Sequence, residues 1–262
     1  MKSTLDKIED IKRNGYSLDF SDVFNNAFEN YQKIALYAGL ILLIFSILAF
    51  FLGGGILVSI YGAEHFNEGF LKSIQNEETT SSVLAIYSLV IAFISALFSP
   101  FTAGFLKMAH SADRDEQFNV STIFSYYNSR YFPQLFIAML LISLTSGLIS
   151  VLFNMAGIVI IDTLIALAIT VFTTLTIPLI IFGDLKAIDA IKSSITLVSK
   201  QPLTIILLLL VAGIASAVGL IGFCIAVAFT IPITYSVKYA LYNAILNIDE
   251  ENSIDSIGSE SE

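Results

Sequence analysis

The sequence IALYAGLILLIFSILAFFL, residues 34–52, contains no charged residue. A bilayer core is about 30 Å thick, and a helix needs roughly 20 apolar residues to cross it. The whole chain has the same character, since 56% of its 262 residues are hydrophobic, 13% are charged, and the mean hydropathy is +0.81. Soluble proteins have about 45–50% apolar and about 25% charged residues. The composition therefore predicts an integral membrane protein and excludes a water-soluble globule.

Further apolar runs follow this first one, and together they predict an all-α fold with six transmembrane helices. The third and fourth runs are separated only by residues 154–157, and the fifth and sixth meet near Gly219 and Gly222. Glycine tolerates the dihedral angles of short reversals, so both joints should be tight hairpins. The predicted spans are Ile34–Leu52 (whose helix can extend to Tyr61), Val83–Met108, Leu135–Phe153, Ile158–Phe182, Leu203–Gly219 and Gly222–Leu246.

Basic residues are distributed unevenly between the two sides of these spans. All lysines and arginines except Lys72 fall on the side of the N-terminal segment, and this includes Lys238 near the end of the last span. Short loops rich in Lys and Arg stay in the cytoplasm, so both termini are predicted to be cytoplasmic. Residues 1–30 contain no apolar stretch, which argues against a cleavable signal peptide.

Each pair of predicted spans is preceded by a segment whose apolar residues have the spacing of one helix face. Ser121 is a candidate N-cap for the second segment. Amphipathic helices of this kind can lie in the headgroup plane of a bilayer. The apolar positions are Phe20, Val23, Phe24, Ala27, Phe28 and Tyr31, then Val120, Ile123, Phe124, Tyr127 and Tyr131, and finally Ala187, Ala190, Ile191, Ser194, Ile195 and Val198, with Ser193 predicted to face water.

The second span of each pair contains one proline, namely Pro100, Pro178 or Pro232. A proline inside a helix removes a backbone hydrogen bond and kinks the helix, so these three residues are predicted hinges. Hydroxyl side chains can satisfy the freed backbone groups in a membrane. The hydroxyl residues placed to do so are Ser99, Thr102, Thr174, Thr176, Thr230 and Thr234.

The matching prolines predict three parallel repeats of an interfacial helix, a span and a kinked span, consistent with pseudo-threefold symmetry about the membrane normal. The repeats are placed at about 20–110, 120–183 and 185–246. They form a membrane domain over 20–248, between a cytoplasmic segment (1–19) and an acidic tail (249–262) that is predicted to be disordered. Mitochondrial carriers also have three repeats, but their Pro-x-Asp-x-x-Lys motif is missing here.

Three stretches of the chain carry a resemblance to known proteins. They are TIPLIIFGDLKAIDAIKSSITLVSKQP (176–202), FTIPITYSVKYALYNAIL (229–246) and, more weakly, SPFTAGFLKMAHSA (99–112). The chain after residue 20 resembles bacterial multi-pass proteins of the YciC-like family and the membrane domain associated with glycerophosphodiester phosphodiesterases. The resemblance implies a non-catalytic six-span module in the bacterial cytoplasmic (inner) membrane. The phosphodiesterase catalytic domain has no counterpart here, so its activity is not implied.

The fourth predicted span carries the candidate polar site, formed by Asp162, Thr163, Thr170 and Thr174. Asp162 has two interpretations. It is either an interfacial carboxylate near a helix start or a buried ion or proton site, because intramembrane charges are costly and usually functional. The threonines share one helix face that either packs against another helix or lines a polar groove.

Other kinds of site find no support in the sequence. His65 and His110 are isolated, whereas a metal site needs three or four convergent ligands. The chain has no HExxH, P-loop or dinucleotide-binding motif, so no catalytic residue, cofactor or metal is predicted. The net charge is −9, without the basic patch that nucleic-acid binding requires.

Two functions remain open. The first is a non-enzymatic membrane module that organises or assists other membrane components, with lipids and either another membrane protein or a second copy as partners. The second is a transporter or lipid-handling protein, with a groove lined by Ser and Thr between the kinked helices. The second function predicts a cavity between the repeats, whereas a sealed bundle would argue against it.

Overall fold

The computed structural model describes residues 3–61, 81–222 and 225–246. Within these ranges the chain is all-helical, and six helices are long and apolar enough to cross a membrane. The predicted all-α fold and the predicted six apolar helices of membrane-spanning length are therefore confirmed, whereas the three hairpin repeats stay a prediction. The predicted acidic tail, His65, Lys72 and Cys224 lie outside the described residues. The spans are Phe20–Gly55, Leu84–Asp113, Phe132–Met155, Val159–Ile181, Pro202–Ile221 and Ile225–Leu246.

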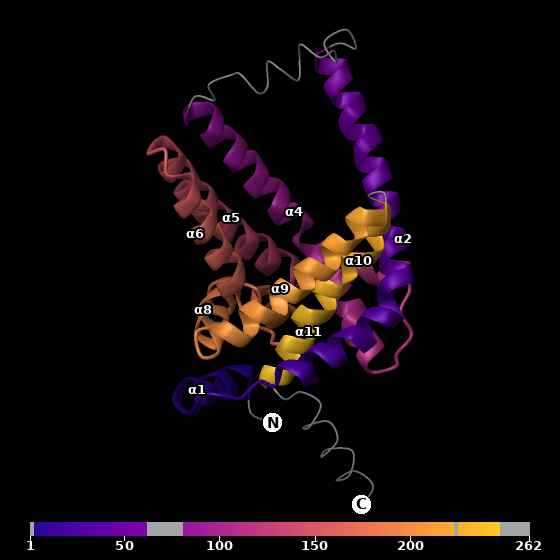
Figure 1. Cartoon of the computed structure of the whole chain (residues 1–262), viewed down its shortest axis with the longest axis vertical. Coiled ribbons are helices and arrows are strands. Elements are labelled where there is room, and N and C mark those ends of the chain that lie inside the picture. Colours follow the sequence, from indigo (N-terminus) through magenta and orange to yellow (C-terminus); the bar gives the residue numbers. More distant parts are fainter. Residues whose placement is uncertain (1–2, 62–80, 223–224, 247–262) are drawn as a thin grey trace, which may run out of the picture.

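Figure 1 shows how the helices are arranged. The short helix α1 and the C-terminal end of α11 lie at one end of the bundle, and the turn between α5 and α6 lies at the other. The elements are α1 (Thr4–Asn14), α2 (Phe20–Tyr61), α4 (Ser81–Asp113), the 3-10 helix η2 (Val120–Phe124), α5 (Phe132–Met155), α6 (Val159–Phe172), α7 (Thr176–Ile181), α8 (Ala187–Val198), α9 (Pro202–Val218), the 3-10 helix η3 (Gly219–Gly222), α10 (Ile225–Thr230) and α11 (Pro232–Leu246).

The N-terminal segment folds into a helix that docks on the membrane domain. Ser3 and Asp6 form a reciprocal capping box at the start of α1, which satisfies two free backbone N–H groups. Lys7 Nζ donates to the Leu246 carbonyl at 3.1 Å. The Tyr16 hydroxyl donates to the Leu197 carbonyl at 2.8 Å. These bonds connect residues 3–16 to both α8 and α11.

The three predicted amphipathic segments take different forms. The first is continuous with its span in α2, because no helix-breaking residue separates them. The third forms α8, as predicted, although Ser193 is buried rather than facing water. The second was predicted wrongly, because only Val120–Phe124 is helical there, as a 3-10 helix capped by Asn119 instead of Ser121.

Local hydrogen bonds explain the short second segment. Ser125 Oγ donates to the Thr122 carbonyl at 2.8 Å, and Ser129 Oγ donates to the Tyr126 carbonyl at 3.0 Å. Serine side chains that bond nearby backbone groups compete with the regular helix ladder. The segment therefore has the apolar spacing of an α-helix but does not form one.

Each amphipathic segment packs on a proline-bearing helix of another span pair. The η2 turn packs on α4, α8 packs on α7, and the first part of α2 packs along α10 and α11. The corresponding residues Val23, Ile123 and Ala190 are all buried. Each segment thus packs on the span pair that precedes it, and the first segment packs on the last pair, as expected for three equivalent units arranged in a ring. That the three units superimpose stays a prediction.

The three prolines lie in different backbone settings, and all three are buried. Pro100 lies inside the continuous helix α4. Pro178 lies in the first turn of α7, after a break that follows Phe172, and Pro232 is the first residue of α11, after a break at Ile231. A helix tolerates proline in its first turn, where the missing N–H has no partner to lose.

Of the hydroxyls predicted to satisfy freed backbone groups, Ser99 does so, whereas Thr174 and Thr176 were predicted wrongly, because their buried hydroxyls have no hydrogen-bond partner among the described residues. Ser99 Oγ donates to the Ala96 carbonyl at 2.7 Å, the group that Pro100 cannot bond. Thr234 Oγ1 donates to the Ile231 carbonyl at 2.8 Å, but this carbonyl also accepts the Thr234 N–H and is not the group that Pro232 leaves unbonded. The Tyr31 hydroxyl of α2 donates to the Phe229 carbonyl of α10 at 3.2 Å. The last bond comes from another span, which the sequence did not indicate.

Candidate functional site

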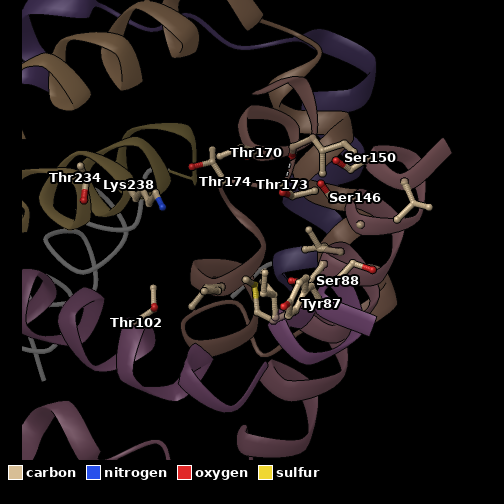
Figure 2. A pocket seen from close by; sticks show the side chains of 18 of the residues that line it. Tyr87, Ser88, Thr102, Ser146, Ser150, Thr170, Thr173, Thr174, Thr234 and Lys238 are labelled. Atoms are coloured by element: carbon tan, nitrogen blue, oxygen red, sulfur yellow. Dashed lines mark hydrogen bonds between the residues drawn. The ribbon is translucent and has the colours of Figure 1, made fainter. Parts of the chain in front are cut away.

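A groove of about 640 Å³ lies between α4, α5, the segment from α6 to α7, and α11. Its walls combine apolar side chains with many hydroxyl groups (Figure 2). Lys238 and Thr234 lie on one side of the groove, and Ser146 and Ser150 lie on the other. The polar lining residues are Tyr87, Ser88, Thr102, Ser143, Ser146, Ser150, Asn154, Thr170, Thr173, Thr174, Thr234, Tyr235 and Lys238.

Helix periodicity brings the polar residues of α5 and α6 to the groove. On α5, Ser143, Ser146, Gly147 and Ser150 follow the i, i+3, i+4, i+7 spacing of one helix face. Gly147 lets α4 approach, because a Cβ there would press against the side chain of Ser88. The small residues of this face bring α4 and α5 together and leave space beside the contact.

Several groove hydroxyls already donate to nearby backbone carbonyls. Thr170 Oγ1 bonds the Ala166 carbonyl at 2.9 Å, and Thr173 Oγ1 bonds the Ile169 carbonyl at 2.7 Å. Thr174 differs, because its side chain is buried and its Oγ1 has no hydrogen-bond partner among the described residues. An unsatisfied buried group costs about 1–3 kcal/mol. Thr174 therefore places an unused hydrogen-bonding group in the groove wall.

Lys238 is the one charged residue among the described residues that line the groove. Its side chain is half-buried and has no ion-pair or hydrogen-bond partner within the described part of the chain. In the sequence, Lys238 indicates topology alone. The available signal was its position inside the apolar run that ends at Leu246, because lysines within spans are costly and usually functional.

The structure divides the predicted polar site. Thr170 and Thr174 line the groove, whereas Asp162 and Thr163 do not. Asp162 accepts hydrogen bonds from Ser150 Oγ at 2.8 Å and from Asn154 Nδ2 at 3.1 Å, which joins α5 to α6 near their turn. The exposed Thr163 donates to the carbonyl four residues before it. Ser150 and Asn154 link the two parts, because both also line the groove.

A second groove, also of about 640 Å³, lies between α5, α6 and α8. It shares Ile142, Ile169 and Thr173 with the first groove. Its lining is almost entirely apolar, and consists of Leu141, Ile142, Thr145, Ile165, Ala168, Ile169, Phe172, Thr173, Ile191 and Ile195. A polar and an apolar groove therefore meet along one wall formed by α5 and α6.

A separate polar cluster joins α2, α4 and α11 outside the grooves. Asp113 accepts from the Tyr239 hydroxyl at 3.0 Å and from Asn30 Nδ2 at 2.9 Å. The Nδ1 atom of His110 lies 3.1 Å from the same tyrosine hydroxyl. Three spans are held together by this network. Within the described residues no group of three or more His, Cys, Asp or Glu side chains could hold a metal ion.

Comparisons of the chain with protein-family models, curated proteins and solved structures gave no match. The resemblance to the YciC-like family therefore stays a prediction.

Proposed function

We propose that this protein is a non-enzymatic lipid-handling protein or transporter that holds an amphipathic lipid within the membrane. The single observation that carries the proposal is the pair of grooves that share one wall, one lined by hydroxyls and the other by hydrocarbon. An amphipathic molecule needs both environments side by side. Neither a sealed bundle nor a uniformly apolar cleft would offer them.

The first groove suits a polar headgroup. Its volume of about 640 Å³ falls within the range of roughly 300–1,000 Å³ typical of small-molecule sites. Hydroxyl groups can replace part of the hydration that a headgroup loses when it leaves the interface, since an unpaired buried polar group is costly. Ser146 of α5 and Thr174, between α6 and α7, supply such hydroxyls, whereas Ser150 of α5 offers only an acceptor oxygen, because its hydroxyl donates to Asp162.

The second groove suits a hydrocarbon chain. Burial of apolar surface stabilises a complex by about 25 cal/mol per Å² in water, but inside a bilayer this gain shrinks because lipid tails are equally apolar. An acyl chain would therefore lie in this groove at little cost. The specificity would come from the headgroup in the first groove.

The alternative role, in organising other membrane proteins, stays a prediction. The outer halves of α2 and α4 expose large apolar side chains, such as Phe50 at 75% and Phe93 at 52%. Ordinary lipid contact explains such surfaces within a membrane span as well as a protein partner would. The paired grooves therefore favour lipid handling.

Native mass spectrometry of the protein purified in mild detergent tests the proposal. The wild-type protein is expected to retain co-purifying lipid. Ser146→Phe places a large ring in the polar groove and should remove most of this lipid. Leu148→Phe is the matched control, since Leu148 is 64% exposed on the same helix and does not line the groove. Equal lipid in all three proteins, or none in the wild type, would contradict the proposal.

A further inference from the structure

We infer that the lipid bound in the groove is anionic and that Lys238 and Thr174 bind its phosphate group. This inference rests on the proposed function and adds the chemical class of the ligand. Two separate features carry it, namely a cation without a counter-ion and a buried hydroxyl without a partner, both in the wall of one groove.

The charge of the groove favours an anion. Among the described residues that line it there is a lysine and no carboxylate, so an anion meets attraction without opposing repulsion. Asp162 lies beyond the wall and already accepts two hydrogen bonds. A lysine inside a membrane span is costly unless a partner or water compensates it. A phosphate oxygen would supply that partner through a short, charge-assisted hydrogen bond.

Snorkelling is the competing explanation for Lys238, because lysines near helix ends often extend to the interface. The side chain instead lines the groove, where its nitrogen extends from α11 toward the space between the helices (Figure 2). Lys107 of α4 provides the contrast. Its ammonium lies 5.8 Å from the centre of the Tyr126 ring and does not line the groove.

Thr174 is the second feature. Only 8% of this residue is exposed, and its hydroxyl has no hydrogen-bond partner among the described residues. The neighbouring Thr173, in contrast, donates to the Ile169 carbonyl four residues before it. The hydroxyl of Thr176 is also buried without a hydrogen-bond partner among the described residues, but Thr176 does not line the groove. A phosphate oxygen could accept from Thr174, whereas a ligand in the groove would leave Thr176 unchanged.

Binding to two lipids of matched acyl chains tests the inference. Purified full-length protein is titrated with phosphatidylglycerol, which is anionic, and with phosphatidylcholine, which is zwitterionic. The wild type should prefer phosphatidylglycerol by about tenfold, because the choline cation of phosphatidylcholine offsets the phosphate charge that Lys238 attracts, whereas the glycerol of phosphatidylglycerol is neutral. Lys238→Met should abolish this preference, Lys238→Arg should retain it, and Lys107→Met should leave it unchanged.

A pair of threonine variants separates ligand binding from damage to the fold. Valine has nearly the shape of threonine, so Thr174→Val and Thr176→Val each remove an unsatisfied hydroxyl and should both raise the unfolding temperature. Only Thr174→Val should lower the affinity for phosphatidylglycerol. A purely structural role for Thr174 predicts unchanged affinity in both variants, and that result would overturn its part in the site.

The outcomes distinguish this inference from the proposed function. If the wild type and Lys238→Met each bind both lipids equally, the inference that the lipid is anionic is wrong, and the proposed lipid-handling function is still supported. If the wild type binds neither lipid, both proposals fall. Inorganic phosphate alone should not raise the unfolding temperature at millimolar concentration. A rise that Lys238→Met abolishes would show that the site takes a free phosphate, which overturns the headgroup as the source.

Discussion

At the residue scale, Ser194 holds the break between α6 and α7 together. Its hydroxyl donates to the Phe172 carbonyl at 2.7 Å and accepts from the Leu175 N–H at 3.1 Å. Both backbone groups lie where the helix ladder is interrupted, and neither could turn to water in a bilayer. One side chain from α8 therefore satisfies both sides of the break before Pro178.

We expect Ser194→Ala to lower the free energy of unfolding by about 1–3 kcal/mol, because the substitution leaves two buried backbone groups unpaired. Ser199→Ala is the control, since the exposed Ser199 bonds only the carbonyl of its own helix. Surface substitutions of this kind usually change stability by less than about 0.5 kcal/mol. Thermal unfolding in detergent measures both. Equal effects would mean that Ser194 does not support the break.

Tyr16 gives a prediction for alkaline pH. Burial raises the pKa of its hydroxyl above the ordinary value, while the unfolded value stays near about 10. The folded state then holds the proton more tightly, so the stabilisation is complete below about pH 10 and is lost as the pH rises toward the folded pKa. The neutral hydroxyl is also the form that donates to the Leu197 carbonyl.

Tyr16→Phe should therefore be less stable than the wild type near pH 8, by about 1 kcal/mol for one lost hydrogen bond. The gap should close as the pH rises above about 10. Unfolding temperatures of both proteins between pH 8 and pH 11 test this. Curves that stay parallel over that range would show that the Tyr16 proton does not contribute.

At the element scale, the contact of α4 with η2 depends on Gly104. A Cβ at this position would collide with the backbone of Ile123. Small residues allow such close approach of backbones within membrane proteins. The contact places the segment after α4 against the proline-bearing part of that helix.

We expect Gly104→Ala to destabilise the protein by about 1–3 kcal/mol, as overpacking of a tight contact does. Gly213→Ala in α9 is the matched control, because nothing lies within 4 Å of the Cβ that it adds. In a helix interior alanine is favoured over glycine by about 1 kcal/mol, so this control should be neutral or stabilising. Equal destabilisation by both variants would argue against a close contact at Gly104.

Sequence patterns predicted the elements better than their contacts. The length and apolarity of a run are local properties, which is why all six spans were predicted from residues such as 34–52. The groove depends on which faces of α4, α5, α6 and α11 meet, and no local pattern contains that information. Thr170 and Thr174 could be predicted as groove residues because they are spaced four residues apart in one predicted span. Lys238 could not, because it lies in a span that is distant in sequence from theirs.

Two departures from the sequence prediction, the second amphipathic segment and the grouping of Asp162 with the threonines, have local causes. Residues 120–131 have helical apolar spacing, but serine hydroxyls that bond nearby carbonyls favour a 3-10 helix and turns. Asp162 was grouped with the threonines on the same helix, yet Ser150 and Asn154 of α5 hold its carboxylate outside the groove. In both cases the deciding partner was a polar side chain that the apolar pattern ignores.

At the scale of the whole molecule, the described residues include six apolar helices of membrane-spanning length, and a bilayer around all six would enclose the grooves. Figure 1 shows α1 and the end of α11 at one end of the bundle, and the turn between α5 and α6 at the other. Lys238, Thr174 and the polar wall of α5 can meet a lipid only if these helices cross the membrane together. Topology is therefore the condition on which both functional proposals depend.

Cysteine labelling in intact cells tests this topology most directly. The native thiol is first removed by Cys224→Ser, and a single cysteine is then introduced at Ala156, in the turn between α5 and α6, or at Gln117, between α4 and η2. Both positions are exposed. A membrane-impermeant maleimide should label Ala156→Cys in intact cells, and Gln117→Cys only after permeabilisation. Labelling of both positions from the same side would contradict the six-span account.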